Sequence, residues 1–260
     1  MTVAAGTGLV VARVDDGIGV LRLSDPARRN ALGKEMSDAL AEQTAGVLAG
    51  GARAIVVTAE PPVFCAGGSL DNLLSGEHPL EAMFAGYQAL AGAPVPTVAA
   101  VAGPALGAGL NLALACDVVL ASESARFESR FMGIGMHPGG GHLWRLARRA
   151  GRQGAAAMVL FGESLDGEQA VRVGLAWRCY ADDEVEPAAL DLARRAAARP
   201  AGLVARAKET LRAAAADGDG DRAFEVEMDA QRWSMSQPDF EAAVRAMKAR
   251  IQEGRAGPPG

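Results

Sequence analysis

Apolar and polar residues alternate in two short segments near the start of the chain, residues 9–14 and 19–23. This alternation is typical of β-strands, and the residues between them, Asp15-Asp16-Gly17, have the composition of a turn. A helical pattern follows from about Lys34, and residues 54–58 are a β-branched run typical of a buried strand. Strand, helix and strand at this spacing predict an α/β arrangement.

A similar order of elements follows in the middle of the chain. Residues 97–101 predict a strand, the glycine-rich residues 103–109 predict a tight turn, and residues 108–115 predict a short helix. Residues 117–120 predict another strand. This second series strengthens the prediction of an α/β fold.

The last sixty residues have a helical character. Residues 218–221 predict a break between two helices, and Asp166 with Gln169 has the spacing of a capping box at a helix start further back. We expect a core at residues 1–200 and a C-terminal helical region at residues 201–260. Apolar side chains recur there at helical spacing, at Phe224, Met228, Phe240, Val244, Met247 and Ile251.

The composition is that of an ordinary globular protein. Half of the 260 residues are hydrophobic, which is enough for a substantial core. Charged residues make up 22% and the net charge is −5. A phosphate backbone attracts basic proteins, so this charge does not favour binding to nucleic acid.

Three further features bear on location and redox state. No window approaches eighteen uninterrupted apolar residues, so we expect no membrane span. Residues 1–16 contain no basic region followed by a long apolar stretch, so we expect no signal peptide. The chain has an odd number of cysteines, and their spacing is not that of metal ligands; they are Cys65, Cys116 and Cys179. We expect reduced thiols, no metal site and a cytoplasmic protein.

Candidate chemistry lies where glycine follows a predicted strand, in residues 62–70 and 103–113. Glycine lets the backbone approach a ligand closely, and a helix beginning near Ala108 adds its N-terminal partial positive charge. Two N–H groups converging on one oxygen would form an oxyanion hole, which stabilises an enolate or a tetrahedral oxyanion. Simple tight turns are the alternative. The glycine spacing fits neither a dinucleotide site nor a P-loop.

Taken together, these segments resemble a known family. Residues 64–68, Phe-Cys-Ala-Gly-Gly, resemble the F-C-A-G-A-D element of the enoyl-CoA hydratase/isomerase (crotonase) superfamily. Residues 103–117 are similar to its G-x-A-x-G-G-G-x-x-L-A-x-x-C-D element, and residues 127–141 to its stretch leading into P-G-x-G. The resemblance covers residues 9–253. The family's next motif follows in order at Arg145-Leu146, Gly151, Gly162-Glu163, Glu168-Gln169-Ala170 and Gly174-Leu175.

The resemblance implies a crotonase (ClpP-like) spiral of ββα units with a C-terminal helical region that helps form trimers, often paired into hexamers. It implies an acyl-CoA thioester as substrate or ligand, a homotrimer or hexamer, and no permanently bound cofactor. The family's two oxyanion-hole amides correspond to Gly68 and Ala108. Because these donors belong to the backbone, the replacement of the family's usual side chains can leave the function intact.

The same resemblance implies where the coenzyme would lie. Residues 28–32, Arg-Arg-Asn-Ala-Leu, are similar to the family's R-x-N-A-L, near which the CoA pantetheine and phosphates lie. The implied thioester-binding residues include Ala31, Ala66 and Gly68. Either Arg28 or Arg29 could pair with a phosphate, and a solvated surface arginine is the alternative for each.

The chain departs from the family at both positions where hydratases carry a glutamate. These positions are Asn111 and Phe131. Adding water to a conjugated double bond needs groups that orient water, accept its proton and protonate the α-carbon. The amide of Asn111 can hydrogen-bond water but cannot exchange protons near neutral pH, and Phe131 can do neither. Ordinary hydration is therefore disfavoured, and so is simple isomerisation.

Other titratable groups are candidate substitutes for these glutamates. Glu128 lies three residues before Phe131, about one helical turn, and could project toward the same cavity. His142 and His137 flank the Pro-Gly-Gly-Gly segment, and either could titrate near neutral pH. A surface carboxylate is the alternative for Glu128, and a structural or surface role is the alternative for each histidine.

We expect structural roles for three other polar or aromatic residues of these motifs. Ser69 stands where the family usually has aspartate, and we expect it to cap or hydrogen-bond locally. Asp117 is expected to be structural rather than catalytic. Trp144 is expected to pack in the core.

Two functions remain open at this level. One is an enzyme of the enoyl-CoA hydratase/isomerase family that polarises a thioester in an oxyanion hole and moves a proton with a nonstandard group. The other is a non-catalytic acyl-CoA binding or carrier protein of the same fold. The glycine turns favour the first, whereas Asn111 and Phe131 favour the second.

Overall fold

The computed structural model of the protein describes residues 8–217, 228–229, 231–233, 235–238 and 240. The chain divides into two compact units, Met1–Arg199 and Pro200–Gly260. Four residues of the predicted C-terminal helical pattern lie outside the described residues, as does the predicted break at residues 218–221; the four are Phe224, Val244, Met247 and Ile251.

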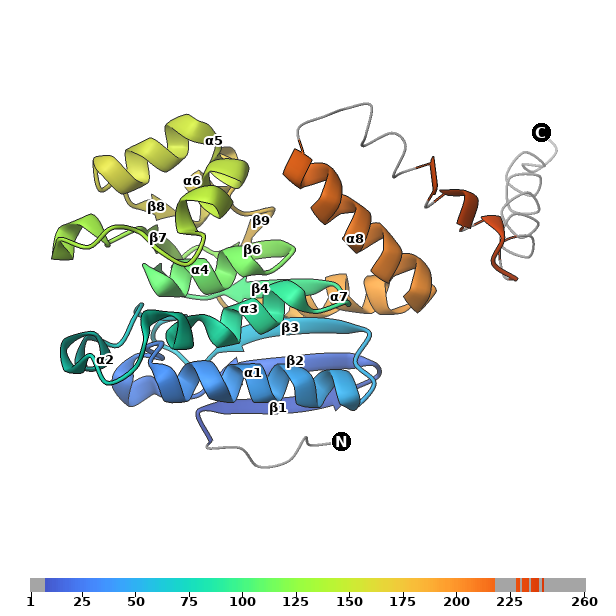
Figure 1. Ribbon diagram of the computed structural model, residues 1–260, viewed down its shortest axis with the longest axis horizontal. Coiled ribbons are helices and arrows are strands. Elements are labelled where there is room, and N and C mark those ends of the chain that lie inside the picture. Colours follow the sequence, from blue (N-terminus) through green and yellow to red (C-terminus); the bar gives the residue numbers. More distant parts are fainter. Residues whose placement is uncertain (1–7, 218–227, 230, 234, 239, 241–260) are drawn as a thin grey trace, which may run out of the picture. The chain divides into compact units, whose positions relative to one another are not determined.

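A six-stranded sheet with the order β1-β2-β3-β4-β6-β9 forms the centre of the first unit (Figure 1). β1 pairs with β2 antiparallel, and the other adjacent pairs are parallel. A smaller sheet has the order β5-β7-β8. The strands are β1 (Val10–Asp15), β2 (Ile18–Leu23), β3 (Ala54–Ala59), β4 (Thr97–Val101), β5 (Pro104–Leu106), β6 (Val118–Ser122), β7 (Arg126–Glu128), β8 (Leu165–Asp166) and β9 (Arg178–Tyr180).

Helices connect the strands, which confirms the α/β class predicted from the sequence. In the first unit the α-helices are α1 (Lys34–Ala49), α2 (Leu70–Ser75), α3 (Ala85–Gly92), α4 (Ala108–Ala115), α5 (His142–Leu160), α6 (Gly167–Arg172) and α7 (Val185–Ala197). Three short 3-10 helices are η1 (Pro26–Arg28), η2 (Leu80–Phe84) and η3 (Met132–Ile134). No helix among the described residues is long and apolar enough to cross a membrane.

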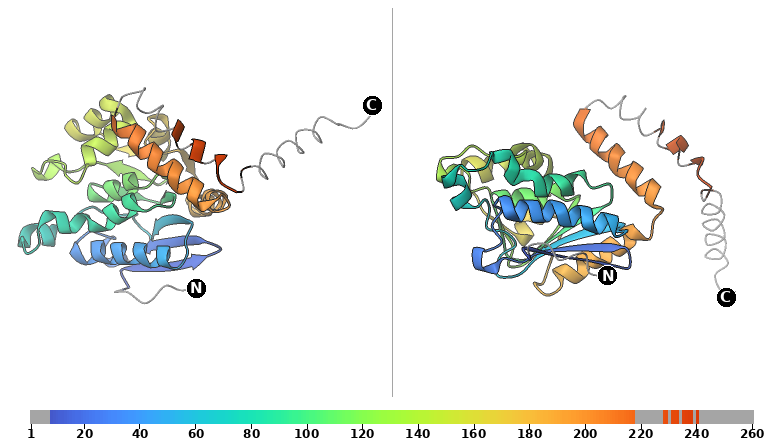
Figure 2. Two further views of the ribbon diagram at one scale, coloured as in Figure 1. Left: turned by 45° about the vertical axis from the view of Figure 1, so that its right-hand side comes forward. Right: turned by 60° about the horizontal axis from the view of Figure 1, so that its bottom comes forward.

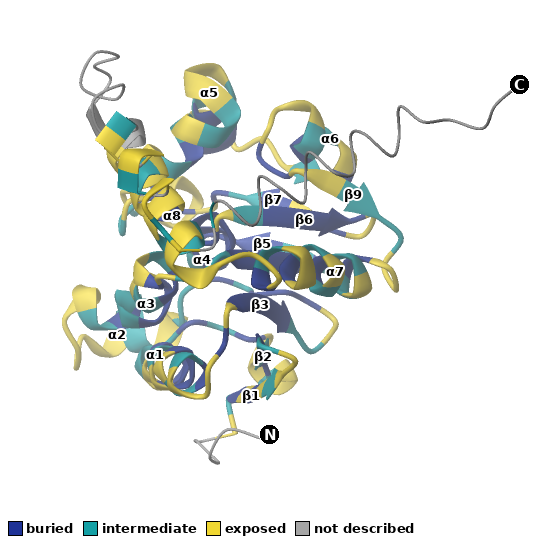
Figure 3. Cartoon of the chain, turned by 90° about the vertical axis from the view of Figure 1, so that its right-hand side faces the viewer, coloured by how far each residue is buried: buried dark blue, intermediate teal, exposed yellow. Residues whose placement is uncertain are grey.

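The inner strands are buried on both faces, which explains their near-continuous apolar runs. In β3, Ile55 and Val57 pack into one apolar cluster, while Ala54 and Val56 pack into the other. Successive side chains of a strand point to opposite faces, so each strand supplies both clusters. Figure 3 shows β3 and β6 in the colour of buried residues.

Helices cover both faces of the large sheet, as a parallel sheet requires. Residues of α1, α3 and α4 belong to the larger cluster, and residues of α7 belong to the smaller one. In the right-hand view of Figure 2, α1 and α7 lie on opposite sides of the strands. The clusters therefore form two layers of core separated by the sheet.

The glycine-rich segment predicted as a turn is partly a strand. Residues 104–106 form β5, which pairs with β7 in the small sheet. Ala105 also bridges Cys65, so the segment is held from two sides. The prediction of a simple turn over residues 103–109 was wrong here, because the tertiary pairing partners lie far away in sequence.

Several local predictions from the sequence are confirmed. The α1 helix begins at Lys34, and the α4 helix occupies residues 108–115 as predicted. Asp166 caps α6: its carboxylate accepts the backbone N–H of Gln169, whose side chain accepts the N–H of Asp166. Ser69 caps α2 by accepting the N–H of Asn72.

The second unit contains α8 (Ala201–Asp217). The guanidinium of Arg206 lies over the indole ring of Trp233, 6.0 Å from its centroid, which is a cation–π arrangement. Lys208 is buried within the structure. The helical character predicted from residue 201 is present over the described part of this unit.

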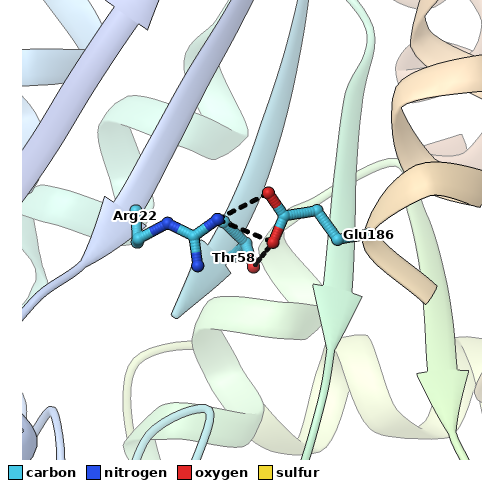
Figure 4. A network of polar contacts seen from close by, with 3 residues as sticks. All are labelled: Arg22, Thr58 and Glu186. Atoms are coloured by element: carbon cyan, nitrogen blue, oxygen red, sulfur yellow. Dashed lines mark hydrogen bonds and ion pairs between the residues drawn. The ribbon is translucent and has the colours of Figure 1, made fainter. Parts of the chain in front are cut away.

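A polar cluster fastens α7 to the sheet. Arg22 of β2 donates from one nitrogen to both carboxylate oxygens of Glu186 in α7, at 2.5 and 2.7 Å (Figure 4). Thr58 of β3 donates its hydroxyl to the same carboxylate at 3.1 Å. The two charged side chains are only 29% and 26% exposed, so their interaction is less weakened by solvent than that of a surface pair.

We expect Arg22→Met to lower the free energy of unfolding by about 1.5 kcal/mol, because it leaves the Glu186 carboxylate half-buried without its cation. Chemical denaturation measures this change. The matched control is Arg172→Ala, which breaks an exposed ion pair with Glu168 and should cost about 0.5 kcal/mol or less. Equal losses in both variants would contradict the importance of the α7 anchor.

Candidate functional site

The two glycine-rich segments of the sequence lie side by side in the structure. Cys65 donates its N–H to Pro104 O at 3.1 Å, and Leu106 donates to Cys65 O at 3.0 Å. On the other side of the first segment, Leu32 donates to Gly67 O at 2.7 Å. The stretch from Cys65 to Gly67 is therefore sandwiched between the loop after η1 and β5.

Glycine is required at two points of this contact. A Cβ added to Gly109 would lie 2.4 Å from the carbonyl oxygen of Cys65, far inside contact distance. A Cβ added to Gly67 would lie 2.9 Å from the carbonyl oxygen of Leu106, and Gly67 has a positive φ of 107°. Backbone atoms cannot yield easily, so only glycine lets the first turn of α4 approach this segment.

The backbone N–H groups of Gly68 and Ala108 are left without a hydrogen-bond partner among the described residues. Gly68 bridges Leu32 in parallel, with Leu32 N bonded to Gly67 O and Ser69 N bonded to Leu32 O, so Gly68's own N–H points away from Leu32. Ala108 is the first residue of α4, where an N–H has no partner inside the helix. Within the described part of the chain, no hydrogen bond satisfies either N–H.

Both residues line one apolar hollow, whose walls come from the α2–η2 region and from the segment before α5. Among the described residues that line it, His137 carries the only titratable side chain. His137 hydrogen-bonds through Nδ1 to the carbonyl of Pro138 at 2.8 Å. The lining residues are Leu32, Gly68, Leu73, Leu80, Met83, Phe84, Ala108, Met136, His137 and Gly139.

The other end of α4 is held by a partly buried cation. Arg149 donates through one nitrogen to the carbonyl of Cys116 and, at 3.4 and 3.3 Å, to those of Leu114 and Asp117. Burial lowers the pKa of Arg149 from its usual value. A cation at a helix C-terminus interacts favourably with the helix dipole and so stabilises α4.

Asn111 is fully buried and both ends of its amide are occupied. The Nδ2 group donates to Gly139 O at 3.1 Å, and Oδ1 lies 2.7 Å from Nδ1 of His142. Asn111 is not among the residues that line the hollow, whereas Gly139 is. The amide therefore supports the wall from behind rather than facing the hollow.

His142 is also buried, with 1% of its surface exposed. Its Nε2 lies 3.0 Å from the hydroxyl of Ser129. Since an amide oxygen can only accept, Nδ1 of His142 must carry a proton toward Asn111, and Nε2 of the neutral ring accepts from Ser129. Burial, with a smaller contribution from Arg145, lowers the pKa of His142 from 6.5 to about 4.

Phe131 lies on the other side of this histidine. It is 8% exposed, and its ring meets the His142 ring edge-on with centroids 4.9 Å apart. Its ring also approaches Gly107, within 4.0 Å of where a Cβ would be. Phe131 is absent from the described lining of the hollow. The two positions to which the resemblance assigns the family glutamates, Asn111 and Phe131, thus both contact His142.

Glu128 does not reach this hollow. It ends β7, so the expected helical turn between Glu128 and Phe131 is wrong; the local structure is a strand that pairs with β5. Its carboxylate accepts from Arg130 Nε at 2.5 Å and from the Ser164 hydroxyl at 3.3 Å. It lines a separate hollow with Arg130 and Ser129, because the strand directs it away from α4.

The residues expected near the coenzyme surround the first glycine segment. Ala66 donates its N–H to Arg29 O at 3.0 Å, which brings residues 29–31 beside residues 66–68. The side chain of Arg28 is 72% exposed and lies 3.9 Å from Glu35, and Arg29 is exposed. Both arginines are accessible to an anion, although Arg28 has a weak carboxylate partner.

Two residues that sequence reasoning missed hold the loop before α5. Tyr87 donates its hydroxyl to Gly140 O at 2.9 Å, and Arg145 donates to the same oxygen at 2.6 Å. The guanidinium of Arg145 also lies over the Tyr87 ring, 5.2 Å from its centroid. Burial raises the pKa of Tyr87 to about 12. Gly140 is needed here, because a Cβ would fall 1.8 Å from the tyrosine oxygen.

Two structural predictions have opposite outcomes. Asp117 accepts hydrogen bonds from the N–H and hydroxyl of Thr97 at 2.8 and 3.0 Å, which confirms its structural role between β4 and β6. Trp144 is 58% exposed and stacks against Arg148 at 5.1 Å, so its expected burial was wrong. A lone tryptophan in a sequence does not reveal which side of a helix faces the core.

We expect the free energy of unfolding to fall as the pH drops from 6.5 to 4, because the unfolded chain takes up a proton at His142 that the folded chain excludes. Stability rises with pH wherever the unfolded state binds more protons, and this site contributes up to about 3 kcal/mol. Urea denaturation at several pH values measures the slope. His142→Asn, which cannot titrate, should flatten the profile in this window; an unchanged slope would refute the assignment.

Comparison with known proteins agrees with the geometry. Residues 13–253 match the family model described as enoyl-CoA hydratase/isomerase. The chain is 42% identical over 257 residues to the probable enoyl-CoA hydratase EchA14 of Mycobacterium tuberculosis, covering 93% of this chain and 98% of that one. It is 32% identical over 251 residues to the 1,2-epoxyphenylacetyl-CoA isomerase of Escherichia coli, covering 93% and 95%.

Solved structures extend the agreement to three dimensions. An enoyl-CoA hydratase from Polaromonas sp. JS666 has a TM-score of 0.86 at 29% identity, covering 93% of this chain and 97% of that one. A putative enoyl-CoA hydratase from Thermobifida fusca, solved in complex with CoA, has a TM-score of 0.79 at 28% identity, covering 88% and 93%. These matches confirm the fold expected from the motifs: the chain belongs to the enoyl-CoA hydratase/isomerase family.

Proposed function

We propose that this protein is an acyl-CoA enzyme that holds a thioester carbonyl oxygen between the backbone N–H groups of Gly68 and Ala108. The observation that carries the proposal is that both residues line one apolar hollow, and neither N–H has a partner within the described chain. Two such donors stabilise the negative charge that develops on the oxygen when a thioester enolate forms. The solved relative in complex with CoA supports the choice of ligand.

The apolar walls strengthen this stabilisation. Leu73, Met83 and Phe84 form part of the apolar wall of the hollow. A hydrogen bond to a charged oxygen gains strength when the surroundings have a low dielectric constant. The partial positive charge at the N-terminus of α4, where Ala108 lies, also stabilises a negative charge on a bound oxygen. The hollow is thus suited to a developing oxyanion and to an apolar acyl group.

His137 is the group that we propose for proton transfer. Its Nδ1 is engaged with the Pro138 carbonyl, so the neutral ring carries its proton there and leaves the Nε2 lone pair available. A histidine in this state can accept a proton from a bound acyl chain and return it. The other two candidates, Glu128 and His142, are less suitable, because Glu128 lines another hollow and His142 is enclosed.

Hydration by two carboxylates is not supported by this site. The amide of Asn111 is bonded at both ends, and Phe131 packs against His142. Neither residue lines the hollow, so neither positions a water molecule there. The reaction that fits best removes a proton from the bound acyl chain to form a thioester enolate and then returns the proton. It does not need an activated water.

A carrier or binding protein of the same fold is the second candidate. The enclosed Asn111–His142 pair favours it, because that pair replaces proton-transfer groups with a rigid neutral support. A carrier would use the N–H groups of Gly68 and Ala108 to hold the thioester carbonyl without turnover. The two functions differ in whether His137 acts on the bound chain.

Other parts of the proposal concern the coenzyme, assembly and location. The exposed guanidinium groups of Arg28 and Arg29 suit the CoA phosphates, with Ala31 and Ala66 beside the pantetheine. We further propose a homotrimer or a hexamer formed from two trimers, with the core at residues 1–200 and the helical region at residues 201–260 contributing to assembly. A cytoplasmic location and the absence of a permanent cofactor complete the proposal.

We expect Ala108→Pro to weaken binding of butanoyl-CoA about fivefold, because proline removes one of the two N–H donors and a hydrogen bond to a neutral carbonyl contributes about 0.5–1.5 kcal/mol. Proline is tolerated at the first position of a helix. Isothermal titration calorimetry measures the affinity, and thermal melting checks folding. Ala108→Gly keeps the donor and serves as the matched control; equal weakening in both variants would argue against the backbone contact.

We expect the wild-type protein to exchange α-protons of butanoyl-CoA with deuterium from heavy water, and His137→Gln to reduce that exchange at least tenfold while leaving the affinity within about threefold. Mass spectrometry follows deuterium incorporation. Binding without exchange in the wild type would favour the carrier. Exchange that persists in His137→Gln would assign the proton transfer to another group. Rapid hydration of crotonyl-CoA by the wild type would refute the argument against an activated water.

A further inference from the structure

A chain of three neutral side chains lies directly behind the wall of the hollow. It runs from the Ser129 hydroxyl to His142 Nε2 at 3.0 Å, then from His142 Nδ1 to Asn111 Oδ1 at 2.7 Å. It ends where Asn111 Nδ2 donates to Gly139 O at 3.1 Å. Gly139 is itself part of the lining, so the chain terminates at the wall.

The direction of each hydrogen bond follows from the chemistry of the groups. An amide oxygen accepts and an amide nitrogen donates, so the contact with His142 Nδ1 fixes which end of Asn111 faces the histidine. The opposite end, Nδ2, must then face Gly139. The Gly139 carbonyl favours the same orientation, because a flipped amide would present its oxygen to that carbonyl. The N–H of His142 Nδ1 adds the second hydrogen bond, which holds the other end of the amide in place.

The loop that receives this bond is rich in glycine and is held by several hydrogen bonds. Residues 139–141 are three consecutive glycines, and two of them, Gly140 and Gly141, have positive φ angles of 66° and 82°. Glycine loses much conformational freedom on ordering, so this segment needs external contacts to stay in place. The described contacts to its carbonyls include those from Tyr87 and Arg145 to Gly140 and from Asn111 to Gly139.

We propose that His142 is a positioning residue, which fixes the Asn111 amide through Nδ1 and thereby holds the Gly139 wall against the ligand. This proposal rests on the proposed function only for the identity of the ligand that the hollow binds. His142 touches neither the hollow nor a bound thioester. The Asn111 side chain accordingly links His142 to Gly139, with one hydrogen bond at each end of its amide. Ser129 holds the histidine ring through Nε2, on the side away from Asn111.

Two substitutions separate the two nitrogens of the histidine. The side-chain nitrogen of asparagine occupies roughly the position of histidine Nδ1, whereas the end of glutamine occupies roughly that of Nε2. His142→Asn therefore retains the donor to Asn111 and loses the bond to Ser129. His142→Gln retains the bond to Ser129 and loses the donor to Asn111. Both remove the ring that packs on Phe131, so packing losses are matched.

The first measurement needs no ligand. Hydrogen–deuterium exchange of a peptide spanning residues 136–146 reports on the N–H groups of His142 or its replacement and of Arg145, which bond to Gly139 O and Gly141 O. We expect exchange to be roughly tenfold faster in His142→Gln than in His142→Asn, because loss of a hydrogen bond worth about 1 kcal/mol or slightly more loosens the loop by about that factor. Equal exchange in the two variants would overturn the proposal.

The second measurement is the affinity for butanoyl-CoA by calorimetry. We expect His142→Gln to bind about fivefold more weakly than His142→Asn, as the loss of one positioning hydrogen bond implies. If the wild-type protein does not bind butanoyl-CoA, the proposed function fails, while the exchange measurement still decides the role of His142. Equal affinities of the two variants, with binding intact in the wild type, would overturn the link from His142 to the wall.

Discussion

The close approach of α4 to the segment around Cys65 is the constraint on which the candidate site depends. Gly109 permits it, since any Cβ there would lie 2.4 Å from a backbone oxygen. The approach brings Ala108, the first residue of α4, into the same hollow as Gly68. A backbone contact of this kind fixes donors more rigidly than side chains can, because it uses the framework of the sheet and carries no rotamer freedom. Substitution of neighbouring side chains therefore leaves the two N–H groups in place.

The two ends of α4 have complementary roles. At its C-terminus Arg149 satisfies the last carbonyl groups and Asp117 ties the following strand to Thr97. At its N-terminus Ala108 keeps a free donor within the described chain. The macrodipole makes these ends unequal: a cation stabilises one and an anion stabilises the other. The partly buried Arg149 thus stabilises the C-terminal end of the helix whose N-terminal end carries the donor of the proposed anion site.

The sequence predicted those features that depend on local pattern. The starts of α1 and α4, the capping box at Asp166 and the α/β order follow from periodicity, capping chemistry and glycine placement. It failed where contacts join distant residues: β5 needs β7 as a partner, and the His142–Asn111 bond spans 31 positions. The burial of His142 could not be predicted from the sequence either, because the residues around a histidine beside glycines do not show whether it is exposed or enclosed.

Under the proposed function, a neutral hydrogen-bonded chain in place of the family's carboxylates would change the electrostatics of the site as well as its proton chemistry. A carboxylate behind Ala108 would repel the negative charge of an enolate, and in a low-dielectric interior that repulsion is large. The amide of Asn111 and the neutral His142 add no net charge there, and the lowered pKa of His142 keeps it neutral above about pH 4. In the proposed function, the donors at Gly68 and Ala108 would then act on the oxyanion without an opposing charge. A neutral chain in this place thus supports the proposal that the site stabilises an enolate and does not activate water.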